Sequence, residues 1–193
     1  MRRLAWRVLI SPGGSVEFTT HVIAVGEANN IDRILKSISS LRGFAVVNIA
    51  PSSEMKSVLF CEENLHAILA GTPTALYLEV LPQAQYKGLV RDKIDQMEQA
   101  AASLRAILRA HYVSDLSDQI REFLHQMEQL VMMLGCHALQ NPESGLSAKI
   151  GLLQDILKQL VASSTEPGDN VSCMDCLQYK ILPALKILRK VFR

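Results

Sequence analysis

The second half of the chain carries apolar residues at spacings of three and four. Within the run 116–134 these residues are Leu116, Ile120, Phe123, Met127, Leu130 and Leu134. Residues at such spacings share one face of an α-helix, so the run predicts a helix that packs lengthwise on other helices. The same rhythm recurs over 90–108 and 146–160. Three antiparallel helices joined by short turns satisfy these patterns, and a fourth segment at the C-terminus can close a bundle.

The first 83 residues show the two-residue alternation that is typical of strands. Apolar and polar residues alternate over 4–10 and over 16–25, on either side of Pro12-Gly13-Gly14. Because glycine adopts positive φ at little cost, this arrangement predicts a β-hairpin. The other elements predicted in this half are a helix over 31–41, strands over 44–50, 57–61 and 75–81, and a short helix over 62–71.

The composition changes between Pro82 and Gly88. β-Branched residues then become rarer, and Gln, Glu, Ala, Leu and Met, which form helices well, replace them. The predicted helices are 84–112, a second from Ser114 to either Gly135 or Asn141-Pro142, a third over 145–163, and a last from Ser172 that Pro183 should kink. We therefore predict an α+β chain: a small mixed sheet with one crossing helix at 1–83, then an antiparallel bundle of three to four helices at 84–193.

The order of hairpin, crossing helix and final strand in residues 1–83 resembles the β-grasp fold of ubiquitin-like domains. The resemblance covers element order and length. The chain does not end in the Gly-Gly pair that conjugation requires, so the resemblance implies a ubiquitin-like fold without conjugation. A generic α+β sandwich explains the same order equally well.

Composition and charge narrow the classes of function. Hydrophobic residues make up 49% of the 193 residues, which is enough for a packed core. The formal net charge of +1 argues against bulk electrostatic binding to nucleic acid. No apolar run approaches the roughly 20 residues that span a bilayer. Arg7 and then Ser11-Pro12 interrupt a short N-terminal likeness to a signal peptide, so we expect a cytoplasmic or nuclear protein.

The most specific local motif is Cys173-Met174-Asp175-Cys176, at the predicted start of the last helix. Backbone N–H groups at a helix N-terminus stabilise a thiolate, which suggests redox chemistry. A structural zinc site needs two further ligands, and although Cys61, Cys136 and His137 are available, no second paired motif occurs. The simplest interpretation is two ordinary reduced thiols. A thiol- or zinc-dependent module around Cys173 and Cys176 is the alternative.

Three common catalytic or nucleotide-binding motifs are absent from the sequence. Gly-x-Ser-x-Gly, Gly-x-x-x-x-Gly-Lys-Ser/Thr and Gly-x-Gly-x-x-Gly are all missing. His111, His125 and His137 fall on the predicted bundle, outside any nucleophile motif. We therefore expect neither enzymatic activity nor a bound cofactor.

One part of the long predicted helix is apolar on every face. The five residues 130–134 are consecutive and apolar, so together they point all around the helix axis. They need cover on every side, from the N-terminal domain, a second copy or a partner. Methionine suits adaptable binding surfaces, although it also fills irregular cores. The candidate partner-binding residues here are Leu130, Val131, Met132 and Met133.

The C-terminal segment 180–193 is basic and amphipathic. One face carries Leu177, Ile181, Leu185, Leu188 and Phe192. The favoured interpretation is the fourth bundle helix, whose cationic end suits the helix dipole. The alternatives are contact with an anionic membrane surface, which is not favoured, and docking into a groove on a partner. The candidate partner-binding residues here are Lys186, Ile187, Arg189, Lys190 and Val191.

These patterns predict a non-enzymatic protein-interaction adaptor or assembly subunit that binds another protein or a second copy of itself. A ubiquitin-like domain followed by a helical bundle also resembles the BAG family of co-chaperones, which implies nucleotide exchange on Hsp70 as a more specific function. The charged helix face that such bundles use is not evident around Leu146–Leu160, where lysines are sparse. No binding residues are therefore transferred from that family.

Overall fold

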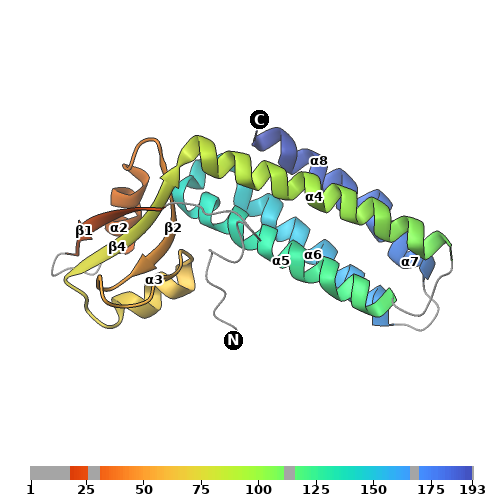
Figure 1. Cartoon of the computed structure of the whole chain (residues 1–193), viewed down its shortest axis with the longest axis horizontal. Helices are drawn as coiled ribbons and strands as arrows, with labels where there is room; N and C mark the ends of the chain where they lie inside the picture. Colours follow the sequence, from red (N-terminus) through yellow and green to blue (C-terminus); the bar gives the residue numbers. More distant parts are fainter. Residues whose placement is uncertain (1–17, 26–30, 111–115, 166–169, 193) are drawn as a thin grey trace. The chain divides into compact units, whose positions relative to one another are not determined.

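The computed structural model describes residues 18–25, 31–110, 116–165 and 170–192 and confirms the α+β class (Figure 1). The first half contains β1 (Thr19–Ala24), α2 (Ile31–Ser39), β2 (Phe44–Ala50), β3 (Val58–Leu59), α3 (Glu62–Leu69) and β4 (Ala75–Pro82). The second half contains α4 (Gln83–Arg109), α5 (Leu116–Gln140), the 3-10 turn η1 (Pro142–Ser144), α6 (Leu146–Thr165), α7 (Asn170–Asp175), the π-helix η2 (Cys176–Ile181) and α8 (Leu182–Val191).

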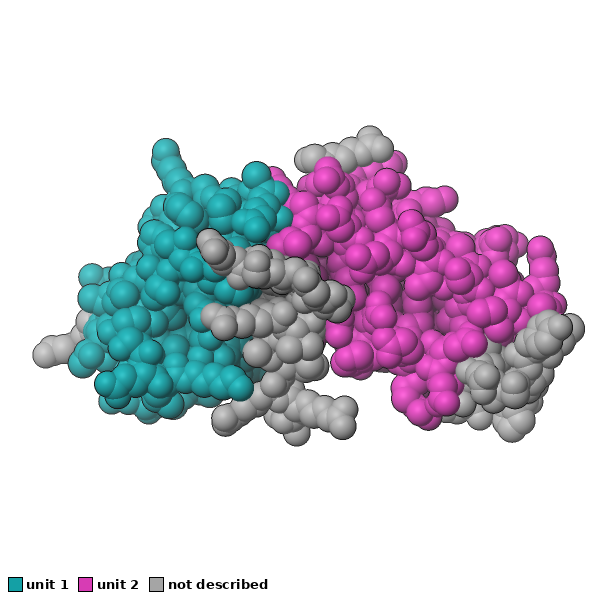
Figure 2. All heavy atoms as spheres, in the orientation of Figure 1, with its two compact units in different colours: residues 1–86, 135–144 teal, residues 87–134, 145–193 magenta. Residues whose placement is uncertain are grey.

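The chain forms two compact units, which Figure 2 colours separately. Unit 1 comprises residues 1–86 and 135–144, and unit 2 comprises residues 87–134 and 145–193. The end of α5, from Gly135, therefore groups with the sheet, whereas the sequence pattern assigned the whole of 84–193 to a bundle. Both α4 and α5 contribute residues to each unit.

The sheet of unit 1 has the order β1-β4-β2-β3, and each of its pairs is antiparallel. The prediction of a mixed sheet is therefore wrong for the described strands, because alternation along a strand indicates which face is buried and not the direction of its neighbour. β4 pairs with β1 from Thr19↔Val80 to Ala24↔Ala75. Its pairing with β2 contains a bulge between Val46 and Asn48. The strand predicted over 4–10 and the turn at 12–14 lie outside the described residues, so the hairpin stays a prediction.

The core of unit 1 forms around β2, whose residues are buried from Ala45 to Ala50. Helix α2 buries Ile34 and Ile38, and α3 buries Leu65 and Leu69. Gly43 adopts a φ of +83° in the turn between α2 and β2, a conformation that glycine tolerates far better than other residues. This turn is tied to the end of the sheet, because the Gln83 N–H donates to the Gly43 carbonyl at 2.8 Å.

The helices of unit 2 lie lengthwise beside one another (Figure 1). Their apolar positions follow the pattern predicted from sequence. Those of α4 are all buried: Val90, Ile94, Met97, Ala101, Leu104 and Leu108. Those of the last segment are buried as well: Leu177, Ile181, Leu185, Leu188 and Phe192. Residues at helical spacing thus form the core of this unit, as the pattern indicates.

Helix α5 continues through Gly135 and ends at Gln140, just before Asn141-Pro142. Of the two predicted ends, the second is therefore correct. One glycine inside a helix costs only about 1 kcal/mol relative to alanine. The buried contacts of Cys136 and Gln140 described below outweigh that cost.

The last helical segment contains a π-helix where a kink at Pro183 is predicted. The Leu182 N–H donates to the Leu177 carbonyl, five residues earlier, which is the π pattern. Proline has no N–H to donate, and its ring collides with the carbonyl four residues before it. The wider turn directly before Pro183 accommodates both effects while Ile181 and Leu185 remain buried.

Candidate functional site

The apolar run of α5 divides into buried and partly exposed residues. Leu130 and Met133 are buried, and so is Leu134. Val131 and Met132 are half-buried. The chain therefore covers most of the run itself, and Leu130 and Met133 act as core residues in this conformation. Val131 and Met132 are the two candidate partner-binding residues of the run that keep accessible surface.

Within unit 1, the end of α5 docks on the sheet through Gln140. Its side-chain amide pairs with both backbone groups of Val46: the Val46 N–H donates to Gln140 Oε1 at 2.7 Å, and Gln140 Nε2 donates to the Val46 carbonyl at 2.8 Å. Gln140 Nε2 also donates to the Cys136 carbonyl at 2.8 Å, and Ser39 Oγ donates to the Gln140 carbonyl at 3.1 Å. One glutamine thus satisfies the backbone at the bulge of β2.

Two further contacts hold the same helix end in unit 1. Cys136 Sγ donates to the Phe60 carbonyl at 2.9 Å, and the rings of Tyr86 and His137 stack with centroids 6.1 Å apart. Burial raises the pKa of both the Cys136 thiol and the Tyr86 hydroxyl. Cys136, Tyr86 and His137 therefore all belong to the buried interior of unit 1.

Unit 2 also exposes apolar side chains from three elements, α6, η2 and α8. Tyr179 of η2 is 66% exposed, Ile187 of α8 is 49% exposed and Leu152 of α6 is 58% exposed. A hydrogen bond of 2.6 Å from Lys180 Nζ to Gln159 Oε1 shows that η2 and α6 lie side by side there.

The spacing places Leu152 and Ile187 on the side of unit 2 that this hydrogen bond marks. Leu152 precedes Gln159 by seven residues, and Ile187 follows Lys180 by seven. Seven residues make about two helical turns, so each pair shares one face of its helix. We call the set Leu152, Tyr179, Lys180, Lys186, Ile187 and Lys190 the α6–α8 strip.

The lysines of the α6–α8 strip differ from the neighbouring Arg189. Lys186 and Lys190 are exposed and have no carboxylate partner within the described part of the chain, and Lys180 binds only the neutral Gln159. Lys190 follows Ile187 by three residues and Lys186 by four, so it shares a helix face with each of them. The strip therefore combines apolar groups with uncompensated positive charge.

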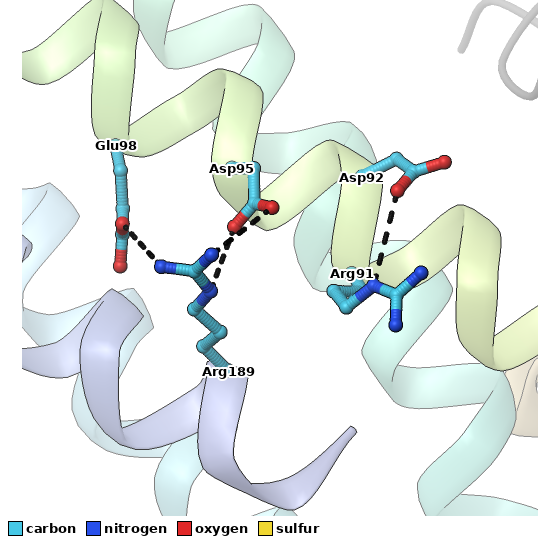
Figure 3. A network of polar contacts seen from close by, with 5 residues as sticks. All are labelled: Arg91, Asp92, Asp95, Glu98 and Arg189. Atoms are coloured by element: carbon cyan, nitrogen blue, oxygen red, sulfur yellow. Dashed lines mark hydrogen bonds and ion pairs between the residues drawn. The ribbon is translucent and has the colours of Figure 1, made fainter. Parts of the chain in front are cut away.

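Arg189 points instead to α4 (Figure 3). Its Nε lies 3.0 Å from Asp95 Oδ1, and its Nη1 lies 3.6 Å from Glu98 Oε2. Both carboxylates are partly shielded from water, with side-chain exposures of 34% and 18%. Arg189 thus fastens α8 to α4, and its charge is compensated within unit 2. Of the C-terminal candidates, Lys186, Ile187 and Lys190 are exposed and Val191 is half-buried.

A separate polar group joins α4 to α5. Lys93 Nζ donates to Gln126 Oε1 at 3.3 Å and to Gln129 Oε1 at 3.1 Å. Burial lowers the pKa of Lys93, and the nearby Glu122 acts in the opposite direction. The exposed His125 lies beside Gln129, with 3.1 Å between its Nε2 and Gln129 Nε2. These contacts link two helices on the surface of unit 2. The third histidine of the predicted bundle, His111, lies outside the described residues.

The Cys-x-x-Cys motif lies inside unit 2. Cys173 and Cys176 are both buried, and Cys176 Sγ donates a long 3.7 Å hydrogen bond to the Ile156 carbonyl. Burial raises the pKa of Cys176, against a smaller lowering by the charge of Lys180. In the part of the chain that the structure describes, no three His, Cys, Asp or Glu side chains are grouped so that they can hold a metal ion.

We expect the rate of thiol modification to differ among the cysteines according to how deeply each is buried. In the native protein, Cys61, which is half-buried, should react first with an aromatic disulfide reagent. The buried thiols of Cys136, Cys173 and Cys176 should react only as fast as the protein opens, because a thiolate must form and meet the reagent. Mass spectrometry of the labelled peptides gives the order of reaction. Rapid labelling of Cys173 or Cys176 in the folded protein would instead support a thiol-dependent activity.

Within the four described ranges, no helix combines the length and the apolar content that a membrane span requires. In comparisons with known proteins, no family model, no curated protein and no solved structure matches the chain.

Proposed function

We propose that this protein is a non-enzymatic adaptor or assembly subunit that binds another protein, or a second copy of itself, through the surface of its helical unit. The observation that carries the proposal is the set of large apolar side chains that the helices of unit 2 leave exposed: Leu152, Val161, Val171, Tyr179 and Ile187. Single exposed apolar residues are ordinary on a protein surface. Leu152 and Ile187, however, each lie about two turns from the Lys180–Gln159 contact, on the helix faces that this contact marks.

Covering this surface would favour association. Covering apolar surface stabilises a complex by about 25 cal/mol per Å², and a fully covered leucine or isoleucine contributes about 1.5–3 kcal/mol. Because association also costs translational and rotational freedom, these side chains must lie at the centre of a larger interface, where energetically dominant contacts commonly lie. Val131 and Met132 add further accessible apolar surface on α5.

Comparative affinity capture tests the proposal. The tagged protein and its Leu152→Asp/Ile187→Asp variant are used as bait in the same cell extract, and captured proteins are quantified by mass spectrometry. A partner that uses this surface should be reduced about tenfold with the variant, since a loss of about 1.4 kcal/mol changes an equilibrium tenfold.

The matched control is Met55→Asp, because Met55 is equally exposed but belongs to unit 1. It should leave capture unchanged. Sedimentation of the protein at micromolar concentration tests self-association in the same way. A strict monomer whose captured proteins do not distinguish the variant from the wild type would contradict the proposal.

A more specific form of the proposal retains the ubiquitin-like order of unit 1. The observation that favours it is a sheet unit followed in the chain by long helices, the order of parts in BAG-type co-chaperones. That form predicts faster release of nucleotide from Hsp70 in the presence of this protein. A release rate equal to that of Hsp70 alone would remove the co-chaperone form and leave the adaptor proposal in place.

A further inference from the structure

We propose that the α6–α8 strip binds an acidic amphipathic helix of a protein partner. The inference rests on the proposed function, because it names the chemistry of the partner that the helical unit receives. It combines three exposed apolar side chains, from α6, η2 and α8, with three lysines that lack carboxylate partners within the described residues.

The apolar part of the strip is oriented away from the core. The segment 176–192 uses one face for the core residues Leu177, Ile181 and Leu185. Tyr179 and Ile187 lie off that face and stay exposed, at 66% and 49%. Leu152 contributes from α6 on the side that contacts Lys180 through Gln159. A partner helix laid along this surface can cover all three with residues spaced three and four apart.

The charge of the segment favours an acidic occupant. Residues 176–192 include Lys180, Lys186 and Lys190 but no Asp or Glu. Arg189 is already neutralised by Asp95 and Glu98, so it is not available to a partner. Glutamates on either side of an apolar stripe would meet the three lysines while the stripe covers Tyr179 and Ile187. This complementarity also predicts an association that weakens with salt.

The same lysines could meet an anionic membrane, but one feature favours a protein. A helix that lies in a membrane interface uses its own apolar face for the lipid. In α8 that face is already occupied by the core of unit 2, as the burial of Leu185 and Leu188 shows. The carboxylate of α6 nearest to Leu152 in this region, Asp155, is paired with Lys158 at 2.9 Å.

The test measures binding of a labelled peptide by fluorescence anisotropy. The probe is a peptide of about 18 residues, or five helical turns, with leucine at spacings of three and four and glutamate at most other positions. A second peptide with lysine in place of glutamate reports on charge. Vesicles of phosphatidylcholine and phosphatidylserine report on a membrane. Each is titrated with the full-length protein at low and at near-physiological salt.

Two sets of variants address the two parts of the strip. The double variant Lys186→Glu/Lys190→Glu should weaken binding of the acidic peptide about tenfold or more, and the uncharged substitution Ile187→Ser should weaken it through loss of the apolar contact. Lys186→Gln/Lys190→Gln provides a milder change if the double reversal perturbs folding. Circular dichroism and thermal melting confirm that each variant is folded.

The matched control is Lys36→Glu/Lys56→Glu, which changes the net charge equally. Both of these lysines are exposed in unit 1. The control should bind the acidic peptide as the wild type does.

We expect the acidic peptide to bind more tightly than the basic one. Both sets of strip variants and added salt should lower the affinity of the acidic peptide. Equal binding of the two peptides, equal loss in the control, preference for the vesicles, or no peptide binding at all would each overturn the inference. The experiments distinguish failure of this inference from failure of the proposed function. If capture of a partner depends on Leu152 and Ile187 while the acidic peptide does not bind, the adaptor role stands and only the acidic helix is wrong.

Discussion

Replacing Gln140 with methionine is expected to destabilise the protein by about 2–4 kcal/mol, because each buried polar group left without a partner costs about 1–3 kcal/mol. Methionine preserves the length of the side chain but cannot pair with the N–H and the carbonyl of Val46. Both groups lie at the bulge of β2 in a buried strand, where water cannot easily replace the lost partner.

Urea unfolding followed by circular dichroism measures this loss. Gln154→Met is the control, since Gln154 is an exposed residue of α6 and the same substitution there should change the stability by less than about 0.5 kcal/mol. If the two variants unfold at the same urea concentration, Gln140 does not hold the end of α5 in unit 1.

Two neighbouring positions in the apolar run of α5 should give opposite results. Leu130→Ala is expected to cost about 2–5 kcal/mol, the usual range for a fully buried leucine, because it leaves a cavity in the core of unit 2. Met132→Ala should cost less than about 1 kcal/mol, because Met132 is only half-buried and loses fewer contacts.

Thermal and urea unfolding of both variants test this contrast, and affinity capture adds a functional measurement. A partner that contacts α5 should be reduced by Met132→Ala at unchanged stability. For Leu130→Ala, any change in capture should follow the loss of folded protein. Similar stability losses at the two positions would show that the assignment of Leu130 to the core and Met132 to the surface is wrong.

The periodic elements could be predicted because they follow from one-dimensional spacing. The α4 positions from Val90 to Leu108 are buried because residues three and four apart share a helix face, whatever the helix packs on. The end of α5 at Gln140 was one of two alternatives, since a lone glycine weakens a helix without forcing it to stop. The strand predicted over 57–61 is shorter in the structure: β3 comprises Val58 and Leu59, and the Phe60 N–H donates to the Val47 carbonyl of β2 at 2.9 Å.

The spacing of apolar residues does not reveal which other segment of the chain packs against a helix face. The run Leu130–Leu134 required cover on every side, but the docking of Gln140 on Val46 depends on a contact across 94 residues of sequence. Nothing in the neighbourhood of Gln140 distinguishes it from the exposed glutamines of the same helices. The π-helix was likewise predicted only as a kink, because Pro183 indicates an interruption without specifying how the backbone accommodates it.

Part of the candidate site is visible in the sequence. Leu152 does not fall on the apolar stripe of its helix, which runs through Leu146, Leu153, Leu157 and Leu160. An apolar residue off the stripe is a signal of exposure, and Tyr179 gives the same signal between Leu177 and Ile181. The compensation of Arg189 by Asp95 and Glu98 could not be foreseen, since it joins residues of distant helices.

The π turn before Pro183 has a consequence for how this segment can vary. A π turn holds one residue more than an α turn, because its hydrogen bonds join residues five apart rather than four. Deleting one residue between Leu177 and Ile181 would therefore let the segment wind as a regular α-helix, with Leu185 and Leu188 still facing the core. Beyond Leu182 the winding is already α, so a deletion there would turn all later residues by about 100° and carry Leu188 away from the core. The C-terminal segment can thus lose a residue on one side of Pro183 far more easily than on the other.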